Sequence, residues 1–386
     1  MKPLCIAPFV ATLVDVTRNV RPCCVWSPNH YLGDLKEKTL IQILEDKPYQ
    51  TAREAMFGQT LPLECQGCTD REAATGWSQR SQFQPDGDAY YKLDGWEDGK
   101  IRYLELNGSN HCNLACIQCS SMYSSAWIAD SKKLGHTYIT PVILGNPDKL
   151  VSDLKELELS ELKYLYFKGG EPMLNPENIA ALLYFEEIDI LKNISLHMIT
   201  NGTVEPTEEF IRLLSKTKDC TIGFSVDGTS ELNPYIRFSK NNFATIDKIE
   251  ATMLKYSQVS NVKFNITCSI MTYNIFKLVE IRDWWLSLQH KGMPVNPNYF
   301  NHLILNKELD IRNLTDKTRI YLIEHYTHHQ IDNEFETVLT TLKLPYLGNE
   351  SHNLWVDYTL QLEKIRNNNI LDIEPLLKDE LVKIYD

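Results

Sequence analysis

Three cysteines lie within eight residues of this sequence, and their spacing suits metal chemistry. Cys112, Cys116 and Cys119 form a C-x3-C-x2-C loop in the run HCNLACIQCS, residues 111–120. Thiolates this close together bind a soft metal ion or an iron–sulfur cluster more often than they fill a core. Three thiolates leave one iron of a [4Fe–4S] cluster without a protein ligand, and an open coordination position is typical of a catalytic metal site. A structural zinc site and three buried structural cysteines are the alternatives.

Short apolar runs that alternate with helical stretches would position this loop. Such alternation is typical of βα units around a parallel sheet. Each run finishes in small or polar residues, so polar groups gather at the carboxyl ends of the strands, where parallel α/β barrels place their chemistry. The predicted strands are Ile101–Leu106, which leads into the cysteine loop, Tyr164–Phe167, Ile194–Ile199, Thr221–Val226, Val262–Cys268 and a weaker run near Tyr299–Leu305.

The cysteine loop and the strand-end residues together resemble the radical S-adenosylmethionine (SAM) enzymes. In that family SAM chelates the open iron, and an electron from the cluster cleaves SAM to methionine and a 5′-deoxyadenosyl radical, which abstracts hydrogen from the substrate. The resemblance implies a SAM-binding [4Fe–4S] cluster at the three cysteines and an α/β fold with a partial (β/α)6 TIM-like barrel. Gln118 departs from the pattern, because the position before the third cysteine is often aromatic or large and apolar in the family.

The resemblance also implies which strand-end residues contact SAM. Paired glycines let the backbone approach a ligand closely, and Glu171 could accept a hydrogen bond from the SAM amino group. Arg237 suits the SAM carboxylate, with a solvated surface arginine as the alternative. Asp227 either contacts SAM or caps the following helix. The predicted cofactor-binding residues are Gly169, Gly170, Glu171, Asn201, Ser225, Asp227, Arg237 and Asn274.

The N-terminal region carries a second cysteine group and resembles SPASM and twitch domains, which ligate auxiliary iron–sulfur clusters. A twitch domain holds one cluster, and four sulfurs suit one fully ligated auxiliary [4Fe–4S] cluster. The predicted ligands are Cys5, Cys23, Cys65 and Cys68. Cys24 remains an open alternative to Cys23, and zinc at the same four sulfurs is the competing interpretation. A glycine often precedes the cysteine at this position in the family; Asn19 is nearby instead, and asparagine tolerates positive φ less freely.

Length and composition bound the domain organisation. The chain has 386 residues, 43% of them hydrophobic, which is enough for a large barrel and a small module. We expect a twitch/SPASM-like auxiliary domain at residues 1–95, the radical SAM barrel at 96–305 and a helical C-terminal cap at 306–386. The predicted C-terminal helices are Lys317–Tyr326, Glu334–Leu342, Leu354–Ile365 and Leu376–Tyr385.

Charge and hydropathy narrow the partners. A net charge of −12 is a poor fit to nucleic acid and to an anionic membrane surface. The sequence shows neither a signal segment nor a bilayer-spanning apolar run, so we expect a cytoplasmic protein. In such a chain, clustered cysteines indicate metal ligands rather than disulfides.

The reaction is the least specified part. Similar enzymes with twitch or SPASM modules modify ribosomally made peptides, so the leading hypothesis is hydrogen abstraction from a peptide or amino-acid-like substrate, with an electron donor such as flavodoxin or ferredoxin. Cys268 is the predicted catalytic residue, because a thiol could return a hydrogen atom to a substrate radical and so epimerise it. A buried structural thiol is the alternative. The alternative functions are a radical dehydrogenase or epimerase of a sugar, aminocyclitol or nucleoside, and a non-catalytic cluster carrier.

Overall fold

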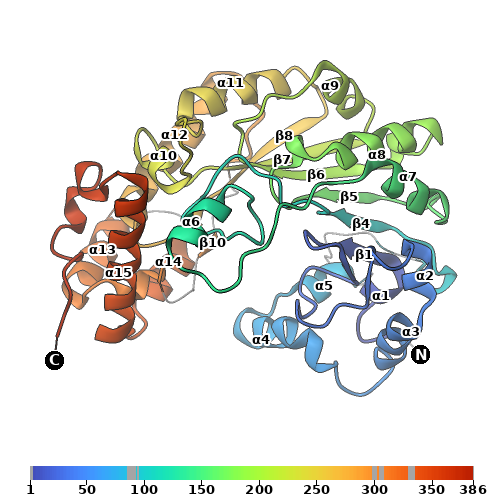
Figure 1. Ribbon diagram of the computed structural model, residues 1–386, viewed down its shortest axis with the longest axis horizontal. Helices are drawn as coiled ribbons and strands as arrows, with labels where there is room; N and C mark the ends of the chain where they lie inside the picture. The colour runs from blue at the N-terminus through green and yellow to red at the C-terminus, as the bar shows by residue number, and fades with distance from the viewer. Residues whose placement is uncertain are drawn as a thin grey trace. The chain divides into compact units, whose positions relative to one another are not determined.

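The computed structural model describes residues 3–84, 93, 95–297, 302–303, 308–328 and 335–385. The chain divides into two compact units, whose elements are labelled in Figure 1. Unit 1 comprises Met1–His111, Val142–Met198 and Glu208–Cys220, and unit 2 comprises Cys112–Pro141, Ile199–Thr207 and Thr221–Asp386.

The main sheet confirms the predicted α/β class. Its strand order is β3-β2-β1-β4-β5-β6-β7-β8. The strands are β1 (Ala11–Val14), β2 (Asn19–Arg21), β3 (Gly33–Asp34), β4 (Tyr103–Leu106), β5 (Tyr164–Phe167), β6 (Ser195–Thr200), β7 (Asp219–Ser225) and β8 (Val262–Thr267). Strands β4, β5 and β6 pair in parallel, with Leu104 opposite Leu165 and Leu165 opposite Leu196. These leucines are fully buried, as expected for parallel strands covered on both faces.

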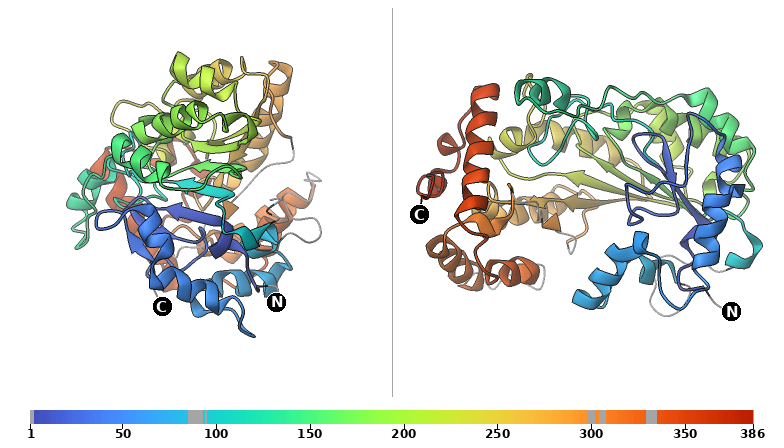
Figure 2. Two further views of the ribbon diagram at one scale, coloured as in Figure 1. Left: turned by 90° about the vertical axis from the view of Figure 1, so that its right-hand side faces the viewer. Right: turned by 60° about the horizontal axis from the view of Figure 1, so that its bottom comes forward.

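The N-terminal segment extends this sheet instead of forming a separate one. β1 pairs in parallel with β4 and antiparallel with β2, and the left view of Figure 2 shows β1 beside β4. All four residues of β1 are buried. The left-handed residue of the β1–β2 turn is Arg18, with φ of 74°. The guanidinium of Arg18 forms a buried ion pair with Glu177 at 2.6 Å.

Short helices complete unit 1. Two of them begin at an Asn-Pro pair: Asn146 accepts a hydrogen bond from the Lys149 N–H at 3.1 Å, and Asn175 accepts one from the Glu177 N–H at 3.2 Å. Such side-chain caps satisfy the unpaired N–H groups of a first turn. The helices are α1 (Ala7–Val10), α2 (Leu40–Glu45), α3 (Lys47–Ala55), α4 (Gln66–Thr75), α5 (Gln79–Phe83), α7 (Pro147–Lys155), α8 (Pro176–Glu187) and α9 (Glu208–Leu214).

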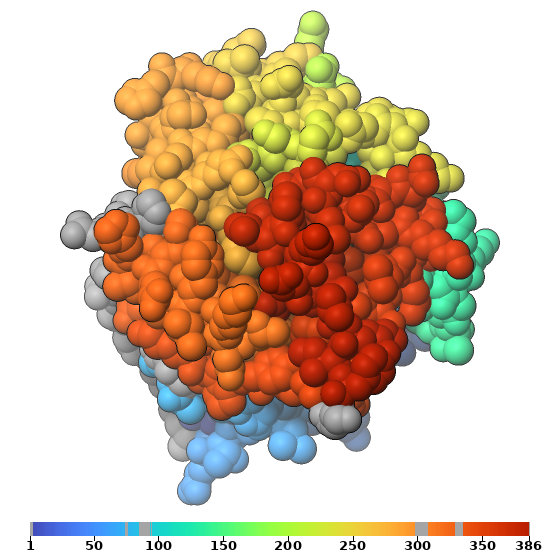
Figure 3. Space-filling model, turned by 90° about the vertical axis from the view of Figure 1, so that its left-hand side faces the viewer, coloured from blue at the N-terminus to red at the C-terminus, as the bar shows by residue number. Residues whose placement is uncertain are grey.

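Unit 2 holds the cysteine loop and the C-terminal helices. Its helices are α6 (Trp127–Lys133), α10 (Leu232–Ile236), α11 (Ile246–Tyr256), α12 (Leu278–His290), α13 (Asp316–His328), α14 (Glu336–Leu342) and α15 (Asn349–Arg366). The right view of Figure 2 shows α15 as the long red helix, and Figure 3 shows the surface that the C-terminal helices form. No helix in the described part of the chain is long and apolar enough to cross a membrane.

The predicted strands and C-terminal helices largely match the structure. Two short strands, β9 (Ser269–Ile270) and β10 (His302–Leu303), pair in parallel. Of the predicted run at Tyr299–Leu305, only His302 and Leu303 lie within the described part of the chain. The predicted helix Leu376–Tyr385 was wrong: a single 3-10 turn, η9 (Pro375–Leu377), is followed by turns and irregular chain.

Candidate functional site

The three cysteines of the loop lie together in unit 2. Cys116 is buried with Leu114 and Ala244, and the half-buried Cys112 and Cys119 pack against the same group. Burial raises the pKa of the Cys119 thiol, and the neighbouring thiols of Cys116 and Cys112 raise it further. Thiols that disfavour ionisation when gathered in this way become good ligands once a cation is bound among them.

Side chains from outside the loop fix its backbone. The Arg366 guanidinium donates to the Ala115 carbonyl at 2.6 Å, and the Trp127 indole donates to the Cys116 carbonyl at 2.6 Å. The Tyr358 hydroxyl donates to the Ile117 carbonyl at 2.7 Å. Arg366 and Tyr358 belong to α15, so the C-terminal helix holds the cysteine loop directly.

Two predicted SAM-binding side chains lie beside the loop sulfurs. Arg237 Nη1 donates to Cys116 Sγ at 3.7 Å, and Asn201 Nδ2 donates to Cys112 Sγ at 3.9 Å. Burial raises the pKa of Cys116, while the positive charge of Arg237 opposes that effect. Donors and charges next to ligand sulfurs tune an iron–sulfur cluster. The solvated-surface alternative for Arg237 is wrong, because its side chain is 8% exposed.

Asp227 is fully buried and connects this group. Its Oδ2 lies 2.9 Å from Arg237 Nε and accepts a hydrogen bond from Gln118 Nε2 at 2.7 Å. Its Oδ1 accepts from the Ser269 N–H at 2.6 Å. The carboxylate therefore binds three protein groups, and it does not cap the start of α10, which begins at Leu232.

The other candidates of unit 2 surround Asp227 or end a strand. Asn274 donates to the Asp227 carbonyl at 2.9 Å and to Cys268 Sγ at 3.8 Å. Its Oδ1 accepts from the Met271 N–H at 2.9 Å, so this side chain braces the chain after β8. Cys268 is fully buried, and burial raises its thiol pKa well above the usual value. Ser225 is the buried last residue of β7.

The predicted Gly-Gly-Glu stretch lies in unit 1 and contacts the chain that leads into the cysteine loop. Gly170 N–H donates to the Ser109 carbonyl at 2.9 Å, and Glu171 N–H donates to the His111 carbonyl at 2.8 Å. A Cβ on Gly170 would lie 2.3 Å from the His111 oxygen, and Gly169 has φ of 111°. The glycines are thus required by this backbone crossing, a reason the sequence did not reveal.

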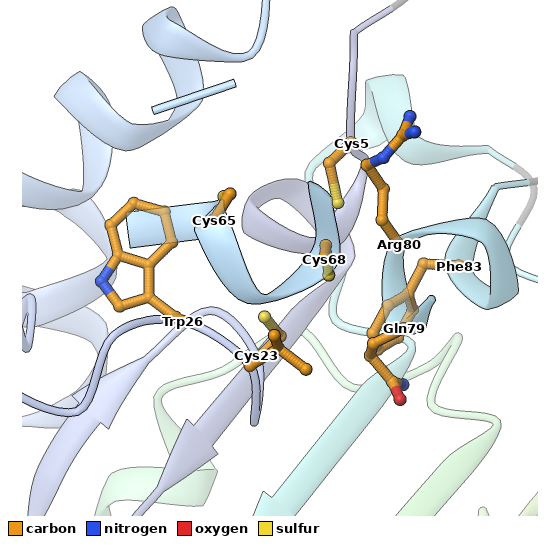
Figure 4. Close-up of a pocket in the computed structure, with 9 residues that line it drawn as sticks. Cys5, Cys23, Trp26, Cys65, Cys68, Gln79, Arg80 and Phe83 are labelled. Carbon is orange, nitrogen blue, oxygen red and sulfur yellow. The ribbon is translucent and has the colours of Figure 1, made fainter. Parts of the chain in front are cut away.

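The four predicted auxiliary ligands line one pocket of unit 1. Figure 4 shows that the side chains of Cys5, Cys23, Cys65 and Cys68 surround a shared space. They come from three segments of the chain: the turn before α1, the segment after β2, and the 3-10 turn η1 (Leu63–Cys65) with the adjoining α4. The pocket has a cavity volume of about 20 Å³, and Cys24 does not line it. Among the described residues, no group of three or more His, Cys, Asp or Glu side chains is arranged to hold a single metal ion.

The pocket wall is otherwise apolar apart from Gln79 and Arg80. Arg80 forms an ion pair with Glu72 and donates to the Leu4 carbonyl at 3.1 Å. Burial raises the pKa of Cys5 to about 12, with an opposing contribution from Arg80. Burial likewise raises the pKa of Cys65 to about 12. Four thiols in a largely apolar wall, two of them buried and two half-buried, fit a thiolate-ligated cluster, since binding to iron offsets the cost of charging them.

One polar group in unit 1 was missed by the sequence interpretation. The buried Glu105 carboxylate lies 3.3 Å from Lys168 Nζ and accepts a hydrogen bond from Asn107 at 2.8 Å. Lys168 lies 4.9 Å from the centre of the Tyr166 ring, and that ring stacks on His197 at 4.5 Å. Burial lowers the pKa of His197 to about 4, so the imidazole is neutral at ordinary pH. The signal was the polar alternation within otherwise apolar strands.

This arrangement defines a class: an α/β protein with a three-thiol loop after one parallel strand and a separate four-thiol pocket. Residues 106–274 match the model of the Radical SAM superfamily, and residues 5–69 match that of the SPASM iron-sulfur cluster-binding domain. The chain therefore carries a region similar to the radical SAM superfamily and a region similar to the SPASM domain. The predicted family and its cofactors, SAM and iron–sulfur clusters, are thereby confirmed.

Solved structures give a weaker comparison. A polyhistidine-tagged form of anSMEcpe with bound AdoMet is 20% identical, with a TM-score of 0.39, and the match covers 62% of this chain and 60% of that one. Native anSMEcpe with AdoMet and the Cp18Cys peptide is 18% identical, with a TM-score of 0.38 and coverage of 62% and 61%. Streptococcus suis SuiB with precursor peptide SuiA is 15% identical, with a TM-score of 0.35 and coverage of 69% and 60%.

The match spans only about 60% of the length of each of these structures. At this level of similarity they carry no argument about the substrate. No curated protein sequence gives a significant match.

Proposed function

We propose that this enzyme reductively cleaves SAM and abstracts hydrogen from a peptide or amino-acid-like substrate. The observation that carries the first half is the loop in unit 2, where three thiols lie together with Arg237 and Asn201 beside their sulfurs. An iron–sulfur cluster, when bound, supplies the electron for SAM cleavage. Cys112, Cys116 and Cys119 would hold it.

The protein's own residues would then bind and orient SAM. Arg237 brings a buried guanidinium with planar donors, which suits the SAM carboxylate. Asn201 has its Nδ2 directed at Asn113 Oδ1 at 2.9 Å as well as at Cys112, so its amide is held at the loop. Gly169, Gly170 and Glu171 remain candidates for the SAM amino group, and Ser225 and Asn274 for its ribose or adenine part.

The auxiliary ligands in this proposal are Cys5, Cys23, Cys65 and Cys68. All four line the pocket of Figure 4, whereas Cys24 is exposed. The lining therefore favours Cys23 over Cys24. A cluster with four protein ligands has no open iron, so this site would serve electron transfer or substrate positioning, not SAM binding.

The peptide class rests on the pairing of a radical SAM region with a SPASM region, as in similar enzymes that modify peptides. Two of the matched proteins, native anSMEcpe and SuiB, have structures with a bound peptide. A small polar substrate is the second candidate, and the compact polar group of Glu105, Lys168 and His197 would suit it.

The decisive experiment is SAM cleavage by anaerobically reconstituted protein under reduction. We expect 5′-deoxyadenosine from the native chain and none from Cys116→Ala, whereas Cys220→Ala, which removes a buried thiol of β7, serves as the matched control and keeps the activity. Absence of 5′-deoxyadenosine from protein that holds iron at the loop would refute the proposal. Screening peptide and sugar libraries for stimulation of cleavage separates the two substrate classes.

Epimerisation with Cys268 as hydrogen donor is the finer proposal. Asn274 donates to both the Cys268 thiol and the Asp227 carbonyl, and so links the two residues. The thiol is fully buried, so a structural role in packing is the alternative. In deuterated water, an epimerase would incorporate solvent deuterium into product, and Cys268→Ala would stop the incorporation. Product without deuterium from the native enzyme would exclude this reaction.

A further inference from the structure

We propose that Asp227 is a positioning residue for the cysteine loop: it holds Arg237 so that the guanidinium donates to Cys116 Sγ, and this hydrogen bond raises the reduction potential of the cluster. The inference rests on the proposed function, because it needs a cluster at the loop. It assigns Asp227 a role through Arg237 in place of the expected direct contact with SAM.

The Arg237 guanidinium contacts the Asp227 carboxylate through Nε and donates to the Cys116 sulfur through Nη1. Arg237 Nε lies 2.9 Å from Asp227 Oδ2, and Nη1 lies 3.7 Å from Cys116 Sγ. The two side chains are 8% and 0% exposed, so water does not compete for these contacts. Because a guanidinium is planar, fixing one edge fixes the direction of its remaining N–H groups.

Asp227 is itself anchored independently of Arg237. Its Oδ1 accepts from the Ser269 N–H at 2.6 Å, and its own N–H donates to Asn233 Oδ1 at 2.9 Å. Asn274 donates to its carbonyl at 2.9 Å. The carboxylate therefore keeps its place if Arg237 is replaced, which makes it a fixed reference for the loop.

The same carboxylate accounts for Gln118, the departure from the family pattern. Gln118 Nε2 donates to Asp227 Oδ2 at 2.7 Å, and only the nitrogen end of an amide can donate to a carboxylate, so the side-chain orientation is fixed. Gln118 Oε1 is buried and has no hydrogen-bond partner among the described residues. Asp227 thus orients Gln118, which precedes Cys119, as well as Arg237, which donates to Cys116.

The sign of the effect follows from charge. Reduction adds negative charge to a cluster and its thiolates, and a cationic N–H donor to a ligand sulfur stabilises the reduced state. The Arg237 contact therefore raises the potential. The charge of Asp227 alone would lower it, so the two possible roles of Asp227 predict opposite effects of its removal.

The test compares reduction potentials of the loop cluster, followed by electron paramagnetic resonance. The loop signal is identified as the one that changes when SAM is added. We expect Arg237→Gln to lower the potential. Asp227→Ala should lower it too, because it removes the acceptor that Arg237 Nε faces and so releases the guanidinium. The double variant should not fall below Arg237→Gln alone, since removing Asp227 lowers the potential no further once the arginine that it positions is gone. Arg282→Gln, which removes an arginine of α12 paired with Asp283, is the control and should not shift it.

Each outcome of these measurements either supports or overturns the inference. A raised potential in Asp227→Ala would show that Asp227 acts by charge alone, and an unchanged potential in Arg237→Gln would show that the sulfur contact has no effect; either overturns the inference. If Arg237→Gln does not assemble the cluster, Arg237→Lys replaces it, because lysine keeps the charge but lacks the planar fork. We expect it to lower the potential less, and native potential there would refute the role of the fork. Native protein without iron at the loop would instead refute the proposed function.

Discussion

The two cysteine groups differ in what completes them. The N-terminal pocket brings together four thiols from three segments of the chain, in a wall whose one cation, Arg80, is paired with Glu72. The cysteine loop supplies three thiols from one short segment, and the groups beside its sulfurs are Arg237 and Asn201. A set closed by thiols suits a fully ligated cluster, and a set bordered by hydrogen-bond donors suits a cluster that also binds a polar ligand.

The largest expected effect separates the two sites by function. Cys116→Ala should lose about four irons and all SAM cleavage, because the loop has no spare thiol. Cys68→Ala should also lose about four irons but keep SAM cleavage. Iron analysis and chromatographic detection of 5′-deoxyadenosine measure both. If Cys68→Ala also abolished cleavage, the division of roles between pocket and loop would be wrong.

The next prediction concerns which thiol closes the pocket. Cys23→Ala should lower the iron content by about four atoms, whereas Cys24→Ala should leave it at the native value. The reason is that Cys23 lines the pocket and Cys24 does not. Equal losses in both variants would mean that both thiols are needed, and the reverse order would move the ligand to Cys24.

A third prediction tests the dependence of the loop on α15. Arg366 forms a buried ion pair with Asp130 at 3.0 Å and lies between the rings of Trp127 and Phe238. Arg366→Met should reduce the free energy of unfolding by about 3–5 kcal/mol, since it leaves the Asp130 charge buried without its partner. Denaturant unfolding measures this loss.

The matched control for that change is Arg212→Met. Arg212 is 38% exposed and pairs with Glu186 on the surface of unit 1, so its loss should reduce the free energy of unfolding far less than the loss of Arg366. Arg366→Met should also lower iron at the loop while sparing the pocket. Equal destabilisation by both variants would contradict the special role of Arg366.

The smallest effect concerns the loss of stability at acid pH in unit 1, which holds the pocket. His197 has its pKa lowered from 6.5 to about 4 by burial, so the unfolded chain binds the proton first as pH falls. The stability it contributes is complete above pH 6.5 and is lost towards pH 4, by an amount on the order of 3 kcal/mol. Unfolding free energies across this range, compared between native protein and His197→Asn, measure it. An exposed histidine variant, His290→Asn, should keep the native pH dependence; a His197→Asn profile identical to the native one would refute the assignment.

Local patterns in the sequence were sufficient for the strands and for the grouping of the thiols. Alternating apolar runs predicted β4, β5, β6, β7 and β8 to within two residues at each end. The cysteine pattern, with its resemblance to SPASM and twitch domains, predicted the four side chains that line the pocket, although they come from three segments of the chain. Both signals depend on residue type and separation along the chain, which a sequence records directly.

Contacts between residues far apart in the sequence could not be predicted from these local patterns. Nothing local to Asp227 indicates that its carboxylate meets Gln118 from a loop 109 residues earlier. Likewise, nothing local to the glycines at 169 and 170 indicates that they also accommodate the backbone of residues 107–111. The amphipathic stretch Leu376–Tyr385 predicted a helix that the structure does not form, because propensity yields to tertiary context in so short a segment.

The parallel pairing of β1 with β4 has a consequence for how this chain can be divided. A fragment beginning near residue 96 would leave one side of β4 without its hydrogen-bonded neighbour, and such an uncovered edge invites association with other chains. The N-terminal region is therefore not a detachable accessory: removing it should yield aggregates rather than a smaller working enzyme.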